Sequence, residues 1–547
     1  MNRFFIFFLL TFTAGILFFS TTSYSENPKT ILKNVHLFSE NEKPNLDVLH
    51  YSISVDLDVK KRIIEGKVII TCVVPKIKNE IVINFYENMQ INSLRLNEDS
   101  IFYKREKNNI IIDRPESNSD TIILMIDYRG TPQRVGLSSF VFGSINKQSL
   151  VFNLNQPNFA STWFPCNDDP SDKALLDIKI TNDIENISVS NGILVDSFSV
   201  GNRKTFHWRS LYPISTYLIA IYSSNYIHFS DKYVSITGDT LPLEYYVLPN
   251  QLEEAKIDFE VHPKIFEIFE NLFGPYPFIK EKYGVATFLW QLGAMEHQTI
   301  TGIGSNFIGG NKFFTDIYVH ELAHHWWGNS VGPKTWKDIW LSEGFATYSE
   351  ALYHESISGK DGLISTMQSK FRNDFQNTLY NPGNDLFTPT VYDKGAWVLH
   401  MLRKKIGDEN FFKSLRKYYE LYKYSNASTL DFLKVCEDVS QKNLTQFFSQ
   451  WVFVGEGIIE ANYSWNFNEL NEVKTLEIKI EQRQTGYNEY QFPLEIKLIY
   501  ENEIEEIKTI FVNQRNYKQI LLVESKPLEI IFDPDNWLLA ELTEENN

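Results

Sequence analysis

The segment VHELAHHWWGNS, residues 319–330, contains the residue types and the spacing needed to hold a metal ion. His320 and His324 are four residues apart, so on a helix they share one face, with Cβ atoms about 5–6 Å apart. Both imidazoles can then reach one zinc ion at about 2.0–2.1 Å. Glu321 is rotated by about 100° from His320 around the helix, so it lies beside the metal without binding it. There it is placed to take a proton from an activated water molecule.

A zinc ion that activates water needs a third protein ligand and one open position. Glu343, in the segment WLSEGFATYSEA, follows His324 after 18 intervening residues, which leaves room for a loop and the start of a second helix. Two neutral imidazoles and one carboxylate leave zinc with a net positive charge, which lowers the pKa of a bound water to about 7. The alternative is a helix whose histidines only pack or hydrogen-bond. Glu343 at this distance favours the metal site, and we expect one Zn²⁺ ion.

The residues next to these ligands have simpler expected roles. His325 comes one position too late to share the ligand face, so we expect it to pack or to support a ligand from behind. Trp326 and Trp327 are expected in the core, and Thr347, one turn beyond Glu343, is a candidate for orienting a ligand.

Hydrophobic periodicity divides the chain into three regions. From about residue 45 to 231, apolar and polar residues alternate with turn residues at short intervals, which is typical of sheets. Apolar residues recur at helical spacing after about residue 243, and alternation returns after about residue 461. The expected strands are 48–57, 65–73, 80–85, 175–181, 187–189, 217–222, 475–480, 494–500, 507–512 and 528–532. The expected helices are 252–273, 315–327, 339–358, 362–378, 394–406, 409–422 and 429–440.

The first 25 residues have the pattern of an export signal. Asn2 and Arg3 precede an almost entirely apolar run from Phe4 to Ser20, and Ser23-Tyr24-Ser25 places small side chains where a signal peptidase reads them. The alternative is a retained membrane anchor, but the run is short for a hydrocarbon core of about 30 Å. We expect cleavage after Ser25, a periplasmic or extracellular protein, and no stable membrane anchor after cleavage.

The net charge and the number of cysteines argue against two classes of protein, those that bind nucleic acid and those held together by disulfides. The formal net charge of −17 argues against nucleic acid as a partner, because phosphate binding needs a basic face. Cys72, Cys166 and Cys436 are too few for a disulfide framework and do not have the spacing of zinc ligands. We expect them to be small buried side chains.

The metal motif and three other segments resemble the aminopeptidase N family of zinc peptidases, which includes leukotriene hydrolase. The H-E-x-x-H motif is followed after 18 residues by glutamate in an E-G-F-A context. Residues 293–297, GAMEH, are similar to the family's G-x-M-E-N element, and residues 391–395, VYDKG, to its Y-x-K-G segment. Residues 155–174 are similar to its glutamine or glutamate followed by a P-C-x-D-x-P-x-x-K-A run. The resemblance covers roughly residues 44–542.

This resemblance implies a multidomain α+β fold and adds names to the three regions. After a signal peptide at 1–25, we expect an all-β saddle domain at 26–235 and a thermolysin-like, mainly helical catalytic domain at 236–455. A C-terminal β-sandwich is expected at 456–547. Larger relatives continue into a helical C-terminal domain that closes over the site. The sequence stops soon after the last β region, so we expect a short form with a more open cleft.

The resemblance also implies an aminopeptidase, which removes one residue from a peptide with a free N-terminus. Glu296 would accept the ammonium group of the substrate, and Gln156 falls where the family carries a residue that reaches the same amine. The backbone of Gly293, Ala294 and Met295 would pair with the peptide as an added strand. A blocked N-terminus should then be rejected, because a buried acceptor left unpaired is costly.

The same resemblance gives Tyr392 and Glu321 their catalytic roles. The Tyr392 hydroxyl would donate to the oxyanion, and Glu321 would take a proton from water and pass it to the leaving amine. His297 stands where the family usually has asparagine, and it brings a group that titrates near neutrality to this position.

Three alternatives remain at this point. A thermolysin-like endopeptidase would share the zinc site without needing Glu296 and Gln156. An epoxide hydrolase like leukotriene hydrolase would need residues of a helical domain beyond this sequence. A non-catalytic peptide-binding relative would have lost Glu321 or Tyr392, and both are present. The preferred N-terminal side chain, the physiological substrate and the oligomeric state do not follow from the sequence.

Overall fold

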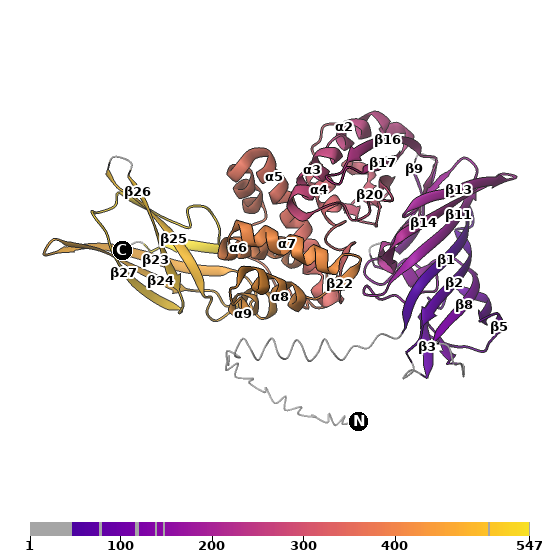
Figure 1. Ribbon diagram of the computed structural model, residues 1–547, viewed down its shortest axis with the longest axis horizontal. Coiled ribbons are helices and arrows are strands. Elements are labelled where there is room, and N and C mark those ends of the chain that lie inside the picture. Colours follow the sequence, from indigo (N-terminus) through magenta and orange to yellow (C-terminus); the bar gives the residue numbers. More distant parts are fainter. Residues whose placement is uncertain are drawn as a thin grey trace, which may run out of the picture.

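The computed structural model describes residues 46–75, 79–114, 120–136, 139–145, 148–501 and 504–545. The expected export signal at 1–25 lies outside these residues. Figure 1 shows a β region, a mainly helical region and a second β region following one another along the long axis of the molecule. This arrangement confirms the expected multidomain α+β fold. Within the described part of the chain, no helix is long and apolar enough to cross a membrane.

The N-terminal region is built on an eight-stranded sheet with the order β13-β14-β11-β1-β2-β8-β4-β5. Its strands are β1 (Asp47–Asp58), β2 (Ile63–Val73), β4 (Gln90–Leu96), β5 (Asp99–Ser100), β8 (Thr121–Gly130), β11 (Lys173–Asp183), β13 (Ile193–Val200) and β14 (Arg203–Ser215). One sheet of β12 (Ile187–Val189), β15 (Tyr222–Ser224), β10 (Gln148–Leu154) and β9 (Ser139–Ile145), and another of β3 (Glu80–Asn84), β7 (Asn109–Asp113) and β6 (Lys104–Glu106), accompany it. The expected strands at 48–57, 65–73, 80–85, 175–181 and 187–189 are present.

The prediction of a strand at 217–222 is wrong. A 3₁₀ turn occupies Thr216–Leu218, and β15 begins only at Tyr222. Side-chain amides take the place of a strand ladder: Asn153 donates to the carbonyl of Ile219 and accepts from the backbone N–H of Ile221. The segment is therefore satisfied by distant side chains, which its apolar sequence does not reveal.

The middle region contains a five-stranded sheet with the order β16-β17-β18-β20-β19. Its strands are β16 (Ile227–Val234), β17 (Thr240–Val247), β18 (Tyr283–Phe288), β19 (Ala294–Met295) and β20 (Ile300–Gly304). β17, β18 and β20 are parallel, and the short β19 lies antiparallel to β20 at the edge. This sheet begins before the domain boundary expected at residue 235, because β16 pairs with β17 rather than with the N-terminal strands.

Helices cover this sheet and make up most of the middle region (Figure 1). They are α2 (Leu252–Phe259), α3 (His262–Phe273), α4 (Thr315–Ala323), α5 (Trp340–Ser369), α6 (Gly395–Ile406), α7 (Asp408–Tyr422), α8 (Thr429–Ser440) and α9 (Thr445–Phe448). The π-helical turn η6 (Thr390–Lys394) precedes α6, and a second one, η7 (Ser449–Phe453), follows α9. The helices expected at 394–406, 409–422 and 429–440 agree with α6, α7 and α8 to within a residue.

Three expected helices differ from the structure. The helix expected at 252–273 is two helices, because Pro263 in the first turn of α3 has no N–H and clashes with a continuing helix. The helix expected at 315–327 ends at Ala323, where the backbone tightens to i→i+3 bonds. The helix expected at 362–378 is the last part of α5 and ends at Ser369, after a break at Gly359.

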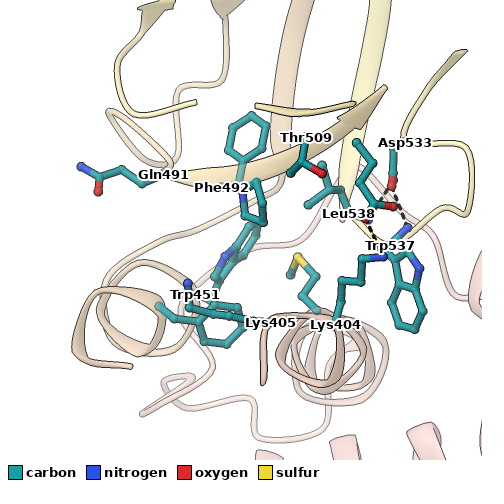
Figure 2. Close-up of a pocket in the computed structure, with 13 residues that line it drawn as sticks. Lys404, Lys405, Trp451, Gln491, Phe492, Thr509, Asp533, Trp537 and Leu538 are labelled. Carbon is teal, nitrogen blue, oxygen red and sulfur yellow. Dashed lines mark hydrogen bonds and ion pairs between the residues drawn. The ribbon is translucent and has the colours of Figure 1, made fainter. Parts of the chain in front are cut away.

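The C-terminal region consists of two sheets, β27-β24-β23-β29 and β26-β25-β28. Their strands are β23 (Ile459–Leu470), β24 (Val473–Gln482), β25 (Phe492–Ile499), β26 (Glu505–Val512), β27 (Asn516–Leu522), β28 (Glu529–Phe532) and β29 (Ala540–Glu544). Buried side chains of β24 and β25 belong to one continuous core with the helical region. A cavity of about 60 Å³ lies where α6 and η7 meet β25, with Trp451, Phe492 and Trp537 among its lining residues (Figure 2).

Candidate metal centre

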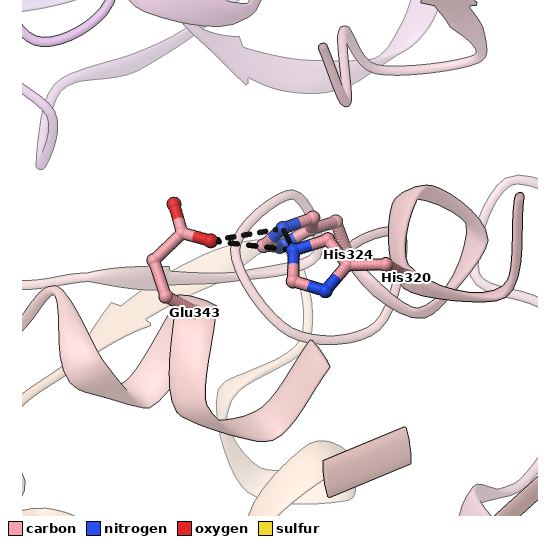
Figure 3. Close-up of side chains that lie close together, drawn as sticks. All are labelled: His320, His324 and Glu343. Carbon is pink, nitrogen blue, oxygen red and sulfur yellow. Dashed lines mark hydrogen bonds and ion pairs between the residues drawn. The ribbon is translucent and has the colours of Figure 1, made fainter. Parts of the chain in front are cut away.

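The two histidines of the metal motif meet as their spacing predicts. His320 lies in the last turn of α4 and His324 is its C-cap residue, and their Nε2 atoms are 3.1 Å apart. Glu343 lies in the first turn of α5, and its Oε2 is 3.5 Å from His320 Nε2 and 3.3 Å from His324 Nε2. Figure 3 shows the three side chains converging from the two helices. The structure therefore brings together the three predicted ligands.

The spacing of these atoms fits a tetrahedral zinc site. Ligand atoms at 2.0–2.1 Å from a tetrahedral ion are separated by roughly 3.4 Å. The three separations of 3.1–3.5 Å agree with this value. Two imidazoles and one carboxylate are also the donor set that favours zinc while leaving one position open. Within the described chain, these residues form the group of histidine, cysteine and acidic side chains suited to one ion.

Hydrogen bonds to the outer ring nitrogens orient both imidazoles. His320 Nδ1 lies 2.8 Å from Glu350 Oε1, and Lys370 Nζ donates to the other oxygen of Glu350 at 2.6 Å. His324 Nδ1 lies 3.0 Å from the Trp327 carbonyl oxygen and 3.1 Å from Ser342 Oγ. These contacts direct each Nε2 toward Glu343, and such partners raise the basicity of a ligand.

Two of these supporting residues were missed in the sequence. Glu350 follows Glu343 by seven residues, or two helical turns, so the same face of α5 carries the ligand and the partner of His320. That spacing was a usable signal. Ser342 carried none, because its contact with His324 depends on how α4 and α5 cross.

Glu321 lies beside the ligands without joining them, as its position on the helix predicts. It lines a cleft together with the three ligands, and one of its carboxylate oxygens is buried with no hydrogen-bond partner in the described chain. Burial raises the pKa of Glu321, and the two histidines act in the opposite direction. Burial also raises the pKa of Glu343, but the histidines outweigh it and hold that pKa below its usual value.

A cleft of about 290 Å³ contains nearly all the predicted site residues. They are Gln156, Gly293, Ala294, Met295, Glu296, His320, Glu321, His324, Glu343 and Tyr392. Leu154, Trp290, Leu292 and Phe387 complete the lining and were not predicted. Among the described residues that line the cleft there is no lysine or arginine, so the charged groups of the cleft are carboxylates and histidines.

Glu296 and Gln156 meet although they lie in different regions of the chain. Gln156 follows β10 of the N-terminal region, and its Nε2 donates to Glu296 Oε1 at 3.3 Å. Glu296 is only 4% exposed and directly follows the edge strand β19. Burial raises the pKa of Glu296, with smaller opposing effects from His324. A cation entering the cleft would stabilise this buried carboxylate.

The side chain of His297 does not line the cleft, which corrects the expectation that it binds substrate. The ring is fully buried, and its Nδ1 lies 2.6 Å from the Tyr222 hydroxyl of the N-terminal region. Consecutive side chains in extended backbone point to opposite sides, so Glu296 faces the cleft and His297 faces away. Burial lowers the pKa of His297 to about 3, and it is therefore neutral.

Tyr392 reaches the cleft from the π-helical turn η6. Its ring stacks on His320, with centroids 6.0 Å apart and an interplanar angle of 20°. Burial raises the pKa of Tyr392 well above its usual value, and Glu343 adds to the effect, so the hydroxyl keeps its proton. A Cβ on Gly395 would lie 2.9 Å from the Cα of Gly344. The two glycines let α5 and α6 touch, which fixes Tyr392 relative to Glu343.

The neighbouring residues have structural roles. His325 is fully buried, and its Nδ1 lies 2.9 Å from the Tyr276 hydroxyl, so the packing role is confirmed. Trp326 and Trp327 are in the core, as expected. Thr347 donates to the carbonyl oxygen of Glu343 at 2.8 Å and thus bonds its own helix backbone rather than a ligand side chain. The three cysteines are free and buried.

Comparisons with known proteins identify two segments of the chain. Residues 47–218 match the peptidase M1 N-terminal domain, and residues 257–451 match the peptidase family M1 domain. A probable aminopeptidase 2 of Sulfurisphaera tokodaii is 26% identical over 428 residues, covering 74% of this chain and 53% of its own. Aminopeptidase N of Lactococcus lactis subsp. lactis is 26% identical over 436 residues, covering 74% and 50%. The chain thus spans about half the length of these relatives.

Solved structures share the fold. Legionella pneumophila aminopeptidase A in complex with aspartic acid superposes with a TM-score of 0.83 at 20% identity, covering 93% of this chain and 61% of that one. A variant of an M1 zinc metallopeptidase from Deinococcus radiodurans, bound to a Tyr-Ser-Ala substrate, superposes with a TM-score of 0.67 at 23% identity. That match covers 75% of this chain and 94% of the other.

The contact between Glu350 and His320 predicts that Glu350→Gln weakens zinc binding by about 10–100-fold, because the ligand loses its charged partner. Competition with a chelating dye measures the affinity. Glu355→Gln is the matched control, since Glu355 lies on the same helix as Glu350 but pairs with Arg403 of α6. Equal zinc affinity of the two variants would contradict the assigned role of Glu350.

Proposed function

We propose that this chain, which belongs to peptidase family M1, is a zinc-dependent aminopeptidase that removes single residues from the free N-terminus of peptides. The observation that carries the proposal is the cleft itself. Glu296 and Gln156 line it together with His320, His324 and Glu343. A group that accepts an amine and a group that holds a metal thus face the same small volume.

Glu296 is suited to bind the ammonium group of a substrate. Its carboxylate is buried, and no lysine or arginine lines the cleft as described. The α-ammonium of a peptide supplies the missing positive charge and hydrogen-bond donors. The side-chain oxygen of Gln156 gives a second acceptor next to Glu296. A peptide with an acetylated N-terminus offers no charge and leaves these acceptors unpaired.

The peptide backbone has a place beside β19. This strand lies at the edge of its sheet, and Gly293, Ala294 and Met295 line the cleft. A peptide can therefore add to the edge as a further strand through main-chain hydrogen bonds. The pairing would direct the amine toward Glu296 and the first peptide bond toward the metal ligands.

The chemical step follows from the remaining residues. Zinc held by His320, His324 and Glu343 would polarise the scissile carbonyl and make a water molecule more acidic. Glu321 takes the proton of the attacking water and then delivers it to the leaving amine. The Tyr392 hydroxyl donates a hydrogen bond to the developing oxyanion, and the loss of such a donor typically lowers the rate by about 10²–10³-fold. The ring of Tyr392 is held for this task by stacking on His320.

The alternatives are less well supported by the cleft. An endopeptidase binds substrate on both sides of the cut bond and has no use for a buried carboxylate at the amine position. A non-catalytic binding protein has no use for Glu321 and Tyr392, which both line the cleft beside the ligands.

Aminoacyl amides test the reaction directly. We expect hydrolysis of free-amine substrates, loss of activity on chelation with recovery on adding zinc, and loss of activity by several orders of magnitude in Glu321→Gln. Glu296→Gln should raise KM for free-amine substrates, because the charge that pairs with the ammonium is gone. Liquid chromatography of the products measures the rate of hydrolysis in each of these experiments. Hydrolysis that survives both chelation and Glu321→Gln would exclude the mechanism.

The cleft lining predicts a preference for large apolar N-terminal residues. Leu154, Trp290, Leu292 and Phe387 provide apolar surface, and the acidic groups of the cleft are Glu296, Glu321 and Glu343. Burial of a large apolar side chain contributes about 1.5–3 kcal/mol, so leucine and phenylalanine amides should exceed alanine amide in kcat/KM by about 10–100-fold. Glutamate amide should be poorest, because like charges repel. A glutamate amide cleaved as well as the leucine amide would contradict this prediction.

A further inference from the structure

The turn 328–330, a few residues after the end of α4, connects the two halves of the cleft. The backbone N–H of Asn329 donates to the carbonyl oxygen of His324 at 2.9 Å. The side-chain Nδ2 of Asn329 donates to the carbonyl oxygen of Glu296 at 2.7 Å. One residue therefore bonds both the metal-ligand segment and the segment of the amine-binding carboxylate.

The turn itself is tightly constrained. Gly328 has a φ of +121°, and a Cβ there would lie 2.4 Å from Ser342 Oγ and 3.4 Å from the Nδ1 of His324. Asn329 is fully buried. A small displacement of this turn is thus transmitted to His324 on one side and to Glu296 on the other, since close-packed segments move together.

Lys173 holds the turn from the other region of the molecule. It is the first residue of β11 in the N-terminal sheet, and its Nζ donates to the carbonyl oxygens of Asn329 at 2.7 Å and Ser330 at 2.9 Å. Among the described residues it forms no ion pair with a carboxylate, and burial lowers its pKa to about 7. Gly332 leaves room for the side chain of Lys173, because a Cβ on Gly332 would lie 3.1 Å from Lys173 Cε.

An ammonium group in this position is costly unless its hydrogen bonds are specific. A neutral apolar side chain of similar length would fill the same space without the desolvation cost. The two carbonyl acceptors are therefore the reason for a lysine here, and both belong to the turn that connects His324 with Glu296.

We propose that Lys173 is a positioning residue that sets the distance between the amine-binding Glu296 and the metal ligands, through the turn 328–330. This inference rests on the proposed aminopeptidase function, in which that distance determines that one residue is removed. Lys173 does not line the cleft and acts through Asn329. A misplacement of about 1 Å in such a site costs up to about 100-fold in rate.

The test compares Lys173→Met and Asn329→Ala with Lys282→Met. Lys282 is a second buried lysine between the same two regions, and its Nζ donates to the carbonyl oxygens of Ser190 and Gly192 rather than to the turn. The measured quantity is the ratio of kcat/KM for a free-amine peptide to that for its acetylated form. Thermal unfolding and bound zinc are measured for each variant.

We expect Lys173→Met and Asn329→Ala each to lower this ratio by about 10–100-fold, mainly through KM for the free-amine peptide, with one zinc ion retained. The double variant should lower it little further, because the two residues act in one chain of contacts. Lys173→Arg should keep most of the ratio, since it retains charge and donors. Lys282→Met should lose thermal stability and keep the ratio.

The inference is overturned if Lys173→Met and Asn329→Ala keep the native ratio, or if Lys282→Met lowers it equally. If Lys173→Met does not fold, Asn329→Ala and Lys173→Arg still decide the outcome. Failure of the proposed function is distinguishable, because the unmodified protein would then show no preference for a free amine.

Discussion

Three ligand atoms from two helices must stay within 3.1–3.5 Å of one another, and the rest of the site is arranged around that requirement. His320 and His324 are related by one turn of α4, but Glu343 comes from α5 and depends on how the two helices cross. Ser342 and Glu350 bond the two imidazoles from α5, so the helix that supplies the third ligand also orients the first two. The contact between Gly344 and Gly395 adds Tyr392 to the same arrangement.

The cleft is built to receive positive charge. Glu296, Glu321 and Glu343 are all buried, and carboxylates placed so close to one another repel. The histidines compensate Glu343, whose pKa is held low, whereas burial raises the pKa of Glu296 and Glu321. A divalent ion at the ligands and an ammonium group at Glu296 would together balance these charges. A zinc ion and an ammonium group have the required charge.

The predictable part of the site is the part encoded by local spacing or by a recognisable segment. The four-residue interval of His320 and His324 and the helix start before Glu343 locate the metal. Sequence also placed Glu296 and Gln156 in the cleft through their segments, but it misplaced His297. The side of an extended segment on which a residue lies depends on the strand that it joins, here the pairing of β19 with β20.

The parts that could not be predicted depend on contacts between distant segments. Residues 217–221 have the apolar character of a strand, yet Asn153 takes up their backbone groups from 66 and 68 residues away. Lys173 and Asn329 are 156 residues apart and lie in two separate segments, and nothing in the sequence shows that the two residues meet. The hairpin of β16 and β17 joins the middle sheet through the parallel pairing of β17 with β18, which the local sequence does not show. Alternation identifies a strand but not its partner.

Mass spectrometry of one unblocked peptide during digestion tests the central claim. This claim is that the distance between Glu296 and the metal ligands restricts cleavage to the first residue after a free amine. The account predicts a ladder of products shortened one residue at a time from the N-terminus, with the acetylated peptide left intact. Internal fragments, products shortened by two residues at once, or equal digestion of the acetylated peptide would contradict it.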